Sequence, residues 1–490
     1  MSERTHLVLI NPGNRRQVFQ NLGDDVAGIE PPFLVAVMAS YLRDKGYGVA
    51  IIDANADNLA PDEVAARVRQ LDPLLAAVIV YGSQPSASTQ NMTNAGLICA
   101  ALSQLGVAKV AIGGLHPSAL PRRTLLEEQV DFVIQGEGIE TIKELLAALD
   151  GGPVQLSEVR GLWYRDREEV HSLPPAPPVP DLDRMLPQAA WDLLPMERYR
   201  AHNWHCFDDI EHRSPYAAIY TSLGCPFNCV FCCINAPFGK PGIRYRSPEK
   251  VVAEIDLLVR DYGIRNLKIV DELFVLHEPH YMGIVDLLIK RDYRLNIWAY
   301  ARVDTVKPEN LARMKEAGIN WLALGIESAN PAVRDQAVKQ MRVQDVRQVV
   351  RSIQDAGIRV IANYIFGLPE ETAETMQETL DMARELECEF ANFYSAMAYP
   401  GSKLYDIAVE SGWGLPASWH GYSQHSYEAT PLPTKYLRAA EVLAFRDHAF
   451  HAYFSGAEYL QMLEEKFGKE VREHIERITA TRLKRKLLGD

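Results

Sequence analysis

Three cysteines lie within eight residues of one another in the middle of the chain. The segment TSLGCPFNCVFCC places Cys225, Cys229 and Cys232 directly after a predicted strand. Thiolates this close together in a loop can converge on one soft-metal centre, as iron-sulfur clusters require. A structural zinc site usually takes two separated pairs of ligands, and the sequence holds no second pair. Buried structural cysteines are the alternative, which the spacing disfavours.

A fourth cysteine, Cys233, follows directly but is not expected to bind the same centre, because adjacent side chains tend to point apart. Three ligands to a four-iron cluster leave one iron open for a substrate or cofactor. The spacing resembles the Cys-x-x-x-Cys-x-aromatic-Cys pattern of the radical S-adenosylmethionine (SAM) superfamily, with Phe231 as the aromatic residue. The resemblance implies a four-iron four-sulfur cluster whose open iron is chelated by the amino and carboxylate groups of SAM. An electron, from a donor such as flavodoxin or ferredoxin, would then cleave SAM to a 5'-deoxyadenosyl radical that abstracts hydrogen from the substrate.

Strand and helix patterns alternate around this loop, from Tyr216 to about Met397. The predicted strands span residues 216–222, 264–271, 294–300, 319–326, 358–366 and 389–397. Six strand-helix units indicate a partial (β/α) barrel, whose site would lie at the carboxyl ends of the strands. An open sheet is the less favoured alternative.

Polar residues and one turn at these strand ends match the SAM-binding pattern of the superfamily. The resemblance assigns Asp271 and Glu272 to the SAM amino group, Arg302 to its carboxylate, Glu327 and Ser328 to the ribose, and Gly367, within FGLP, to the adenine side. A lone carboxylate at a strand end is more often a helix cap or a surface charge. The prediction therefore depends on their common register at consecutive strands.

The first 150 residues show a second alternation of short β-branched runs and amphipathic stretches. The predicted strands span residues 6–12, 48–53, 74–83, 107–114 and 130–138. Their nearly continuous apolar character predicts a parallel, doubly wound sheet that is buried on both faces. Ligands bind such a Rossmann-like sheet at the carboxyl ends of its strands.

Three segments of this part resemble the cobalamin-binding domain that precedes the barrel in one branch of the superfamily: LINPG, GGLHPSALP at 113–121 and QGEGIET at 135–141. The resemblance covers roughly residues 5–405 in all. The candidate cobalamin-binding residues are Asn11, Gly82, Ser83, Gly113, Gly114, His116, Gly136 and Glu137. The Asp-x-His-x-x-Gly motif that gives cobalt an imidazole ligand in many cobalamin proteins is absent from the chain. A weakly ligated cobalt would favour the cob(I) state, which can take a methyl group from SAM. His116 either contacts the corrin or bonds the local backbone.

The expected organisation is therefore an α/β protein with a doubly wound domain at 1–150, a connector at 151–205, a partial (β/α)6 barrel at 206–405 and a helical appendage at 406–490. The connector includes the proline-rich SLPPAPPVPDLD, from Ser172 to Asp183, which reads as an extended spacer. The cations at 482–486 are interpreted as favourable charges at a helix C-terminus rather than as an anion-binding surface.

Composition narrows the function classes. The net charge of -13 argues against binding nucleic acid by broad phosphate neutralisation. No signal-peptide pattern and no run of 18 apolar residues is found. Seven cysteines in 490 residues do not make a disulfide framework, so a reducing, cytoplasmic setting is expected. The oligomeric state is not readable from the sequence.

The leading hypothesis is a cobalamin-dependent radical SAM enzyme that methylates an unactivated carbon of a small-molecule or lipid biosynthetic intermediate, through methylcobalamin and a 5'-deoxyadenosyl radical. Cyclisation, ring contraction or oxidation without methyl transfer is the alternative, and a non-catalytic corrinoid or iron-sulfur sensor is the alternative of another class. Five tyrosines near strand ends either line a substrate pocket or pack in the core: Tyr81, Tyr300, Tyr364, Tyr394 and Tyr399. Cys206 is either a catalytic residue or a spare thiol, of which the spare thiol is favoured, and Cys99 and Cys388 are interpreted as core residues.

Overall fold

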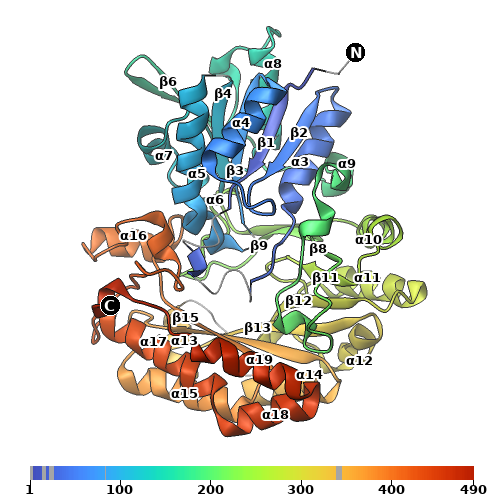
Figure 1. Cartoon of the computed structure of the whole chain (residues 1–490), viewed down its shortest axis with the longest axis vertical. Coiled ribbons are helices and arrows are strands. Elements are labelled where there is room, and N and C mark those ends of the chain that lie inside the picture. Colours follow the sequence, from blue (N-terminus) through green and yellow to red (C-terminus); the bar gives the residue numbers. More distant parts are fainter. Residues whose placement is uncertain (1–3, 14–17, 21–26, 83, 107, 338–344) are drawn as a thin grey trace.

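The computed structural model describes the whole chain except residues 1–3, 14–17, 21–26, 83, 107 and 338–344. Two parallel sheets lie one above the other, the N-terminal sheet at the top of Figure 1 and the barrel below it. The carboxyl ends of the upper strands point toward the barrel, so the two predicted ligand-binding edges face one another.

The N-terminal sheet has the strand order β2-β1-β3-β4-β5-β6-β7, and its first five strands are parallel. These five are β1 (Leu7–Asn11), β2 (Val49–Asp53), β3 (Leu75–Val80), β4 (Lys109–Gly114) and β5 (Phe132–Ile134). The helices are α3 (Phe33–Asp44), α4 (Pro61–Leu71), α5 (Pro85–Leu105), α6 (Leu115–Ala119), α7 (Pro121–Glu127) and α8 (Ile139–Leu149).

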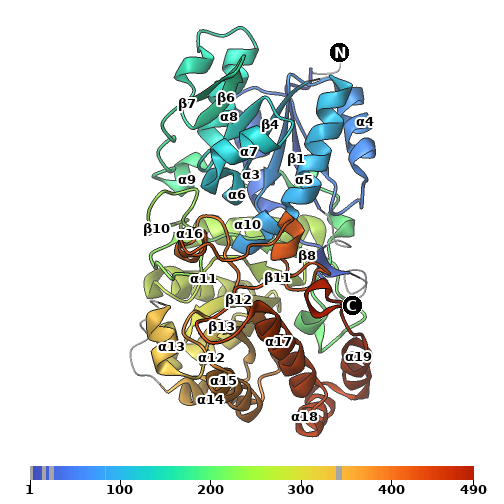
Figure 2. The same ribbon diagram turned by 90° about the vertical axis from the view of Figure 1, so that its left-hand side faces the viewer.

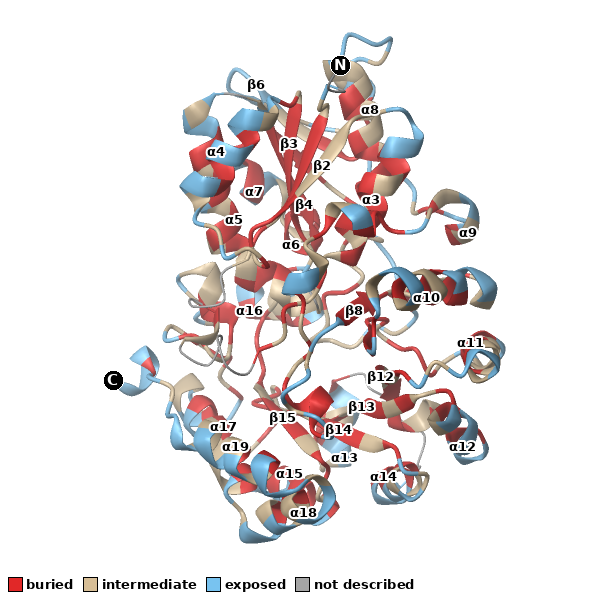
Figure 3. Ribbon diagram, turned by 45° about the vertical axis from the view of Figure 1, so that its right-hand side comes forward, coloured by how far each residue is buried: buried red, intermediate tan, exposed pale blue. Residues whose placement is uncertain are grey.

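Helices cover both faces of this sheet, as the apolar strands predicted. Leu7 and Leu9 of β1 pack in the core that holds α3 and α8, whereas Val8 and Ile10 pack in the core of α4 and α5. Figure 3 shows the central strands buried and the outer faces of the helices exposed. The doubly wound fold is thereby confirmed.

The sheet extends beyond the predicted boundary at residue 150. An antiparallel hairpin, β6 (Leu162–Asp166) and β7 (Glu169–Ser172), pairs with β5 and continues it. The segment predicted as connector thus belongs in part to the first sheet, because a short polar hairpin at a sheet edge carries little of the apolar pattern that marks buried strands. The proline-rich residues 173–181 contain neither helix nor strand.

The six predicted barrel strands are all present. They form one parallel sheet in the order β15-β14-β13-β12-β11-β8, with no bond closing β15 to β8 among the described strands. The strands are β8 (Tyr216–Ile219), β11 (Asn266–Ile269), β12 (Asn296–Arg302), β13 (Ile319–Glu327), β14 (Arg359–Phe366) and β15 (Phe390–Ser395). The helices are α10 (Pro248–Tyr262), α11 (Glu278–Arg291), α12 (Pro308–Glu316), α13 (Pro331–Gln336), α14 (Val346–Asp355) and α15 (Ala373–Leu386). Ser247 caps α10 through its side chain, with Pro248 at the first helical position.

A second hairpin that the sequence did not predict encloses the cysteine loop. Strand β9 (Ser222–Cys225) pairs antiparallel with β10 (Gly242–Tyr245), so the two ends of the cysteine loop lie side by side. Cys225 is the last residue of β9 and pairs with Gly242. The hairpin fixes the first cluster cysteine to the barrel.

The C-terminal part is helical only in its second half. Helix α16 (Lys403–Glu410) is followed by an irregular stretch to residue 438, and then by α17 (Ala439–Phe454), α18 (Ala457–Phe467) and α19 (Lys469–Ala480). Figure 2 shows these last three helices beside the lower sheet. Short elements complete the chain: α9 (Leu182–Met185) and the 3-10 turns η1 (Leu156–Glu158), η2 (Trp191–Leu193), η3 (Met196–Arg198), η4 (Trp204–Cys206), η5 (Val303–Thr305), η6 (Trp419–Tyr422) and η7 (Lys486–Leu488).

The helical appendage predicted at 406–490 is confirmed in α16 to α19, whereas residues 411–438, a stretch rich in Gly, Ser and Pro, contain no α-helix. The basic terminus also differs from its prediction, because α19 ends at Ala480 and Arg485 is buried beyond it. Among the described helices, none is both long enough and apolar enough to span a bilayer.

Candidate functional site

The cysteine loop opens on a cavity at the mouth of the barrel, which we call the cysteine cavity. Cys225, Cys229 and Cys232 all line it, together with Cys233 and the predicted aromatic residue Phe231. In the described part of the chain, no three His, Cys, Asp or Glu side chains are grouped closely enough to hold a single metal ion. Three thiols around one open cavity therefore fit a larger iron-sulfur cluster better than one ion.

Burial sets the ionisation of these thiols. It raises the pKa of Cys225 to about 11 and that of Cys232 well above its ordinary value. Without a metal these two thiols stay protonated at neutral pH, so binding an iron cluster would release their protons.

Of the two acidic residues after β11, only Glu272 lines the cysteine cavity. Burial raises the pKa of Glu272 to about 8. A buried carboxyl group of this kind favours a cationic ligand, because the ligand's positive charge stabilises the ionised carboxylate. The SAM amino group predicted for this position is such a cation.

Asp271 faces the other way and supports the cysteine hairpin. Its carboxylate accepts hydrogen bonds from the Thr221 backbone N–H at 2.6 Å, the Thr221 hydroxyl at 2.5 Å and the Ser222 hydroxyl at 2.6 Å. Thr221 Oγ1 lies 2.9 Å from His280 Nε2, which donates to it since the hydroxyl proton is already used. The prediction that Asp271 binds SAM does not fit this geometry, because neighbouring residues leaving a strand point to opposite sides.

Arg302 and Glu327 line the cysteine cavity together with Glu272. The Arg302 guanidinium lies 4.0 Å from the centre of the Phe227 ring and is held by Asp304, at 2.9 Å from Nε and 3.0 Å from Nη2. The backbone of Glu327 has a φ of 65°, which is uncommon for a residue other than glycine. One cation and two carboxylates around the cavity match the zwitterionic amino-acid part of SAM and its sulfonium.

Two further predicted SAM residues are structural in this fold. Ser328 is fully buried, with its hydroxyl 3.2 Å from Thr379 Oγ1 and 3.4 Å from Glu371. Gly367 has a φ of 83° and donates its N–H to Glu371 at 2.6 Å, and a Cβ there would lie 2.4 Å from Val442 Cγ1. Both residues thus organise a turn around Glu371, whose pKa burial raises to about 7. Sequence reasoning missed Glu371, which follows the turn as an ordinary charged residue.

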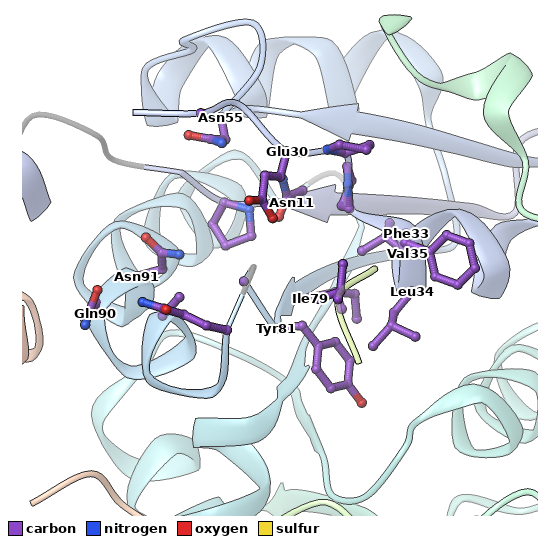
Figure 4. A pocket seen from close by; sticks show the side chains of 18 of the residues that line it. Asn11, Glu30, Phe33, Leu34, Val35, Asn55, Ile79, Tyr81, Gln90 and Asn91 are labelled. Atoms are coloured by element: carbon purple, nitrogen blue, oxygen red, sulfur yellow. The ribbon is translucent and has the colours of Figure 1, made fainter. Parts of the chain in front are cut away.

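A second cavity lies at the carboxyl ends of β1 and β3, and we call it the sheet-edge cavity. Figure 4 shows its amide side chains, with Asn11 and Asn55 on the sheet side and Gln90 and Asn91 on α5. Amides at this edge can bond the carboxamides at the rim of cobalamin, so the donor set fits the cofactor that the resemblance implied. Gly82 also lines this cavity.

The other predicted cobalamin residues lie elsewhere. Gly113, Gly114, His116, Gly136 and Glu137 are not among the lining of this cavity, and Ser83 lies outside the described residues. His116 is buried, 3.2 Å from Thr89 Oγ1, with its ring 4.4 Å from that of Trp419. Burial lowers the pKa of His116 to about 3. The His116 ring therefore packs against side chains of distant segments and does not bond the local backbone, which was one of the two alternatives. Its contact with the corrin stays a prediction.

Packing and domain contacts explain three of these residues. A Cβ on Gly114, whose φ is 133°, would lie 2.2 Å from the Val80 carbonyl, so only glycine fits beside β3. Gly136, with a φ of 102°, donates its N–H to Ser118. Glu137 forms an ion pair with Arg244 and accepts from the Val179 N–H at 2.6 Å, which ties the first domain to the cysteine hairpin.

A third cavity, the barrel cavity, runs inside the partial barrel between the other two. Tyr300, Tyr394 and Tyr399 line both it and the cysteine cavity, whereas Tyr81 lines the sheet-edge cavity. Tyr364 is fully buried and stacks on Phe393, so it is a packing residue.

A buried ion pair that the sequence did not reveal lies at the base of these cavities. Lys268 Nζ is 3.0 Å from both carboxylate oxygens of Glu30, and His202 Nε2 is 3.5 Å from Glu30. The partners come from distant segments, so no local pattern marks them.

The remaining cysteines do not belong to the site. Cys99, Cys206 and Cys388 are buried away from the three cavities, and burial raises the pKa of Cys206 to about 12. Cys206 therefore stays an inert thiol at neutral pH.

Two family models match this chain in the order of its domains. The model of the B12 binding domain matches residues 21–146, and that of the Radical SAM superfamily matches residues 219–383. A curated relative, the uncharacterized methyltransferase PH0819 of Pyrococcus horikoshii, is 32% identical over 396 residues, which cover 80% of this chain and 82% of the relative. The anaerobic magnesium-protoporphyrin IX monomethyl ester cyclase of Rubrivivax gelatinosus is 29% identical over 395 residues, covering 78% and 67%.

A solved structure has the same fold over nearly the whole length. The radical SAM methyltransferase TsrM of Kitasatospora setae, with cobalamin and a four-iron four-sulfur cluster bound, superposes with a TM-score of 0.69 at 16% identity, covering 98% of this chain and 100% of that one.

The family models and the curated relatives show that this protein is an enzyme of the radical SAM superfamily. More narrowly, the chain belongs to the cobalamin-binding branch of that superfamily. Its cofactors are a four-iron four-sulfur cluster, SAM and cobalamin.

Proposed function

We propose that this enzyme is a methyltransferase that methylates an unactivated carbon of a small-molecule or lipid biosynthetic intermediate. When bound, the cluster with SAM supplies the radical chemistry of the superfamily, and cobalamin supplies methyl transfer. The chain's own residues hold these groups, position the substrate and exclude water.

The observation that carries the proposal is the continuity of the three cavities. Gln84 lines all of them. Tyr300, Asn363 and Tyr394 line both the barrel cavity and the cysteine cavity, and His202 lines both the barrel cavity and the sheet-edge cavity. A substrate in the barrel cavity would therefore face a group at the cysteines and a group at the sheet edge at once.

The residues proposed for each group follow from the cavity walls. Cys225, Cys229 and Cys232 would hold the cluster, and Glu272 and Arg302 would hold the charged ends of SAM. The amide-bearing residues at the sheet edge, Asn11, Asn55, Gln90 and Asn91, would hold the rim of cobalamin. The electron donor would be a flavodoxin or a ferredoxin.

Isotope labelling tests the reaction. The anaerobically reconstituted enzyme would be given SAM labelled with ¹³C in its methyl group, and a metabolite extract from a strain that lacks the gene. We expect a product that carries the label, with equal amounts of S-adenosylhomocysteine and 5'-deoxyadenosine, and no product when cobalamin is omitted. A labelled product formed equally well without cobalamin would refute the proposal.

Ring formation or oxidation is the second candidate, and the Rubrivivax gelatinosus cyclase favours it. It predicts consumption of SAM to 5'-deoxyadenosine and a product with no added carbon. High-resolution mass spectrometry of the same reaction separates the two candidates.

A further inference from the structure

Aromatic side chains form part of the lining of the barrel cavity, beside amide and hydroxyl side chains. Those on strands β12 and β15 and on helix α17 are Trp298, Tyr300, Phe390, Phe393, Tyr394, Phe450 and Phe454. The cationic side chains of Lys268 and Arg446 also line this cavity, and its described lining contains no aspartate or glutamate. Which ligand charge the cavity favours depends on whether carboxylates of the protein neutralise these two cations.

The charge of Lys268 is neutralised within the protein. Its ammonium group contacts both oxygens of Glu30 at 3.0 Å. Burial raises the pKa of Glu30, but Lys268 and His202 outweigh that effect and bring the pKa down to about 2. Glu30 therefore stays ionised, and this pair adds no net charge to the cavity.

The charge of Arg446 is not neutralised in the same way, because two arginines share one carboxylate. Arg446 Nη1 lies 2.9 Å from Asp447 Oδ1, but Arg485 contacts the same carboxylate at 2.7 and 2.8 Å. Both guanidinium groups are buried. A second carboxylate, that of Asp490, accepts from the Arg485 backbone N–H at 2.6 Å, but in the described residues Asp447 is the one carboxylate that contacts the two guanidinium groups. Arg446 therefore shares its counter-ion with Arg485.

Arg446 lines the barrel cavity, and one of its nitrogens has no hydrogen-bond partner among the described residues. Nε donates to the Phe393 carbonyl at 2.8 Å and Nη1 to Asp447, while the described residues give Nη2 no hydrogen-bond partner. Nearby, His425 lines the cavity, and burial together with the two guanidinium groups lowers its pKa, so it adds no charge. Gln424 Oε1 and His425 Nδ1 are buried atoms for which the described residues offer no partner.

An uncompensated buried charge is costly unless a partner neutralises it. Guanidinium groups bind carboxylates strongly and with defined geometry. We propose that the substrate carries a single carboxylate, which binds Arg446, and an apolar or aromatic body, which lies along the aromatic side chains of the cavity toward Tyr300 and Tyr394. This inference rests on the proposed function and names the substrate class of the same site.

A matched pair of probes tests the inference without turnover. The probes are 1-naphthylacetate and its neutral amide, 1-naphthylacetamide, which share shape and apolar surface and differ in charge. Their affinities for the reconstituted holoenzyme would be measured by isothermal titration calorimetry. We expect the acid to bind at least about tenfold more tightly than the amide, the size of one charge-assisted hydrogen bond.

Two variants locate the effect. Arg446→Gln removes the guanidinium charge, so the acid and the amide should bind with about equal affinity. Arg446→Lys should keep part of the preference for the acid. Arg485 does not itself line the cavity, so Arg485→Gln leaves Arg446 paired one-to-one with Asp447 and should lower the preference for the acid. Arg472→Gln, an exposed arginine on α19, is the control and should bind both probes as the wild type does.

Equal affinities of acid and amide for the wild type would overturn the inference, as would no binding of either probe at about 5 mM. A preference that persists in both Arg446→Gln and Arg485→Gln would overturn it too. Because the wild-type comparison needs no variant, misfolding of Arg446→Gln leaves the test decisive. Since no step of the reaction is measured, failure of methyl transfer and failure of this inference are distinguishable.

Discussion

At the scale of single residues, the charged groups of the cysteine cavity divide into those that face a ligand and those that hold the protein. Glu272, Arg302 and Glu327 line the cavity, whereas Asp271 and Ser328 are turned into the protein. The distinction matters for mutagenesis, because the same loss of activity would have different causes in the two sets.

Replacing Glu272 by Gln should weaken SAM binding about tenfold, because the amide cannot neutralise the cationic amino group in a buried cavity. Equilibrium dialysis with radiolabelled SAM on the cluster-loaded enzyme measures this. Glu309→Gln, an exposed carboxylate in the first turn of α12, is the matched control. Unchanged affinity in Glu272→Gln would show that another residue binds the amino group.

Replacing Asp271 by Ala should instead reduce the amount of cluster, because the hairpin that carries Cys225 loses three hydrogen bonds. Hydrogen bonds to a charged group contribute about 1.5–3 kcal/mol each, so we expect less than half of the wild-type iron content. Iron analysis and visible absorbance after reconstitution measure it. Cobalamin binding should be retained, and full iron content with lost SAM binding would contradict the positioning role.

At the scale of elements, turns and hairpins bring the strand ends to their working positions. The hairpin β9–β10 anchors the cysteine loop, and the turn at Gly367 is closed by Glu371, which accepts from the N–H groups of Gly367 and Leu368. Two effects act on the pKa of Glu371 in opposite directions: burial raises it, and the hydrogen bonds from the two backbone N–H groups lower it. Burial has the larger effect, so the pKa is raised to about 7.

This pKa predicts how stability depends on pH. The folded state keeps the proton of Glu371 up to about pH 7, whereas the unfolded chain loses it near pH 4.5. The folded state therefore binds more protons in this window, and stability should fall by about 3 kcal/mol as pH rises from 4.5 to 7. Melting temperatures of wild type and Glu371→Gln over that range measure it. We expect a flatter profile in Glu371→Gln, and the wild-type slope in the control Glu370→Gln.

At the scale of the whole molecule, the C-terminal tail fastens the irregular stretch that follows α16. Arg485 donates to the Ser426 carbonyl at 3.0 Å, and the Lys486 N–H donates to the Tyr427 carbonyl at 2.9 Å. The same stretch touches the N-terminal domain, where Trp419 packs on His116. It thereby connects the two sheets across the barrel cavity, which Gln424 and His425 line.

Deleting residues 481–490 should free this stretch. We expect amide hydrogen exchange at 423–427 to become at least about tenfold faster, because the tail's hydrogen bonds and the Arg485–Asp447 ion pair are lost. Exchange in β1 and β3 should not change and serves as the internal control. Unchanged exchange at 423–427 would show that the stretch is held by its own contacts.

The cysteine loop, the parallel strands of the two sheets and the order of the domains could be predicted from the sequence alone. Ligand spacing within eight residues and the apolar runs of buried strands are local properties that need no tertiary contact to be read. Asp271 and Glu272 show a limit of prediction from local sequence. Two adjacent acidic residues look equivalent in the sequence, and only the course of the chain after β11 decides which of them faces the cysteine cavity.

The tertiary structure alone decided the pairings across long separations. Lys268 contacts Glu30 across 238 residues of chain. Arg485 contacts Asp447 of α17 and Ser426 of the irregular stretch, and helices α18 and α19 lie between these residues and Arg485 in the sequence. It also showed His116 and Gly114 to be packing residues. Such contacts depend on how sheets and helices pack, and packing brings together side chains whose spacing along the chain carries no signal.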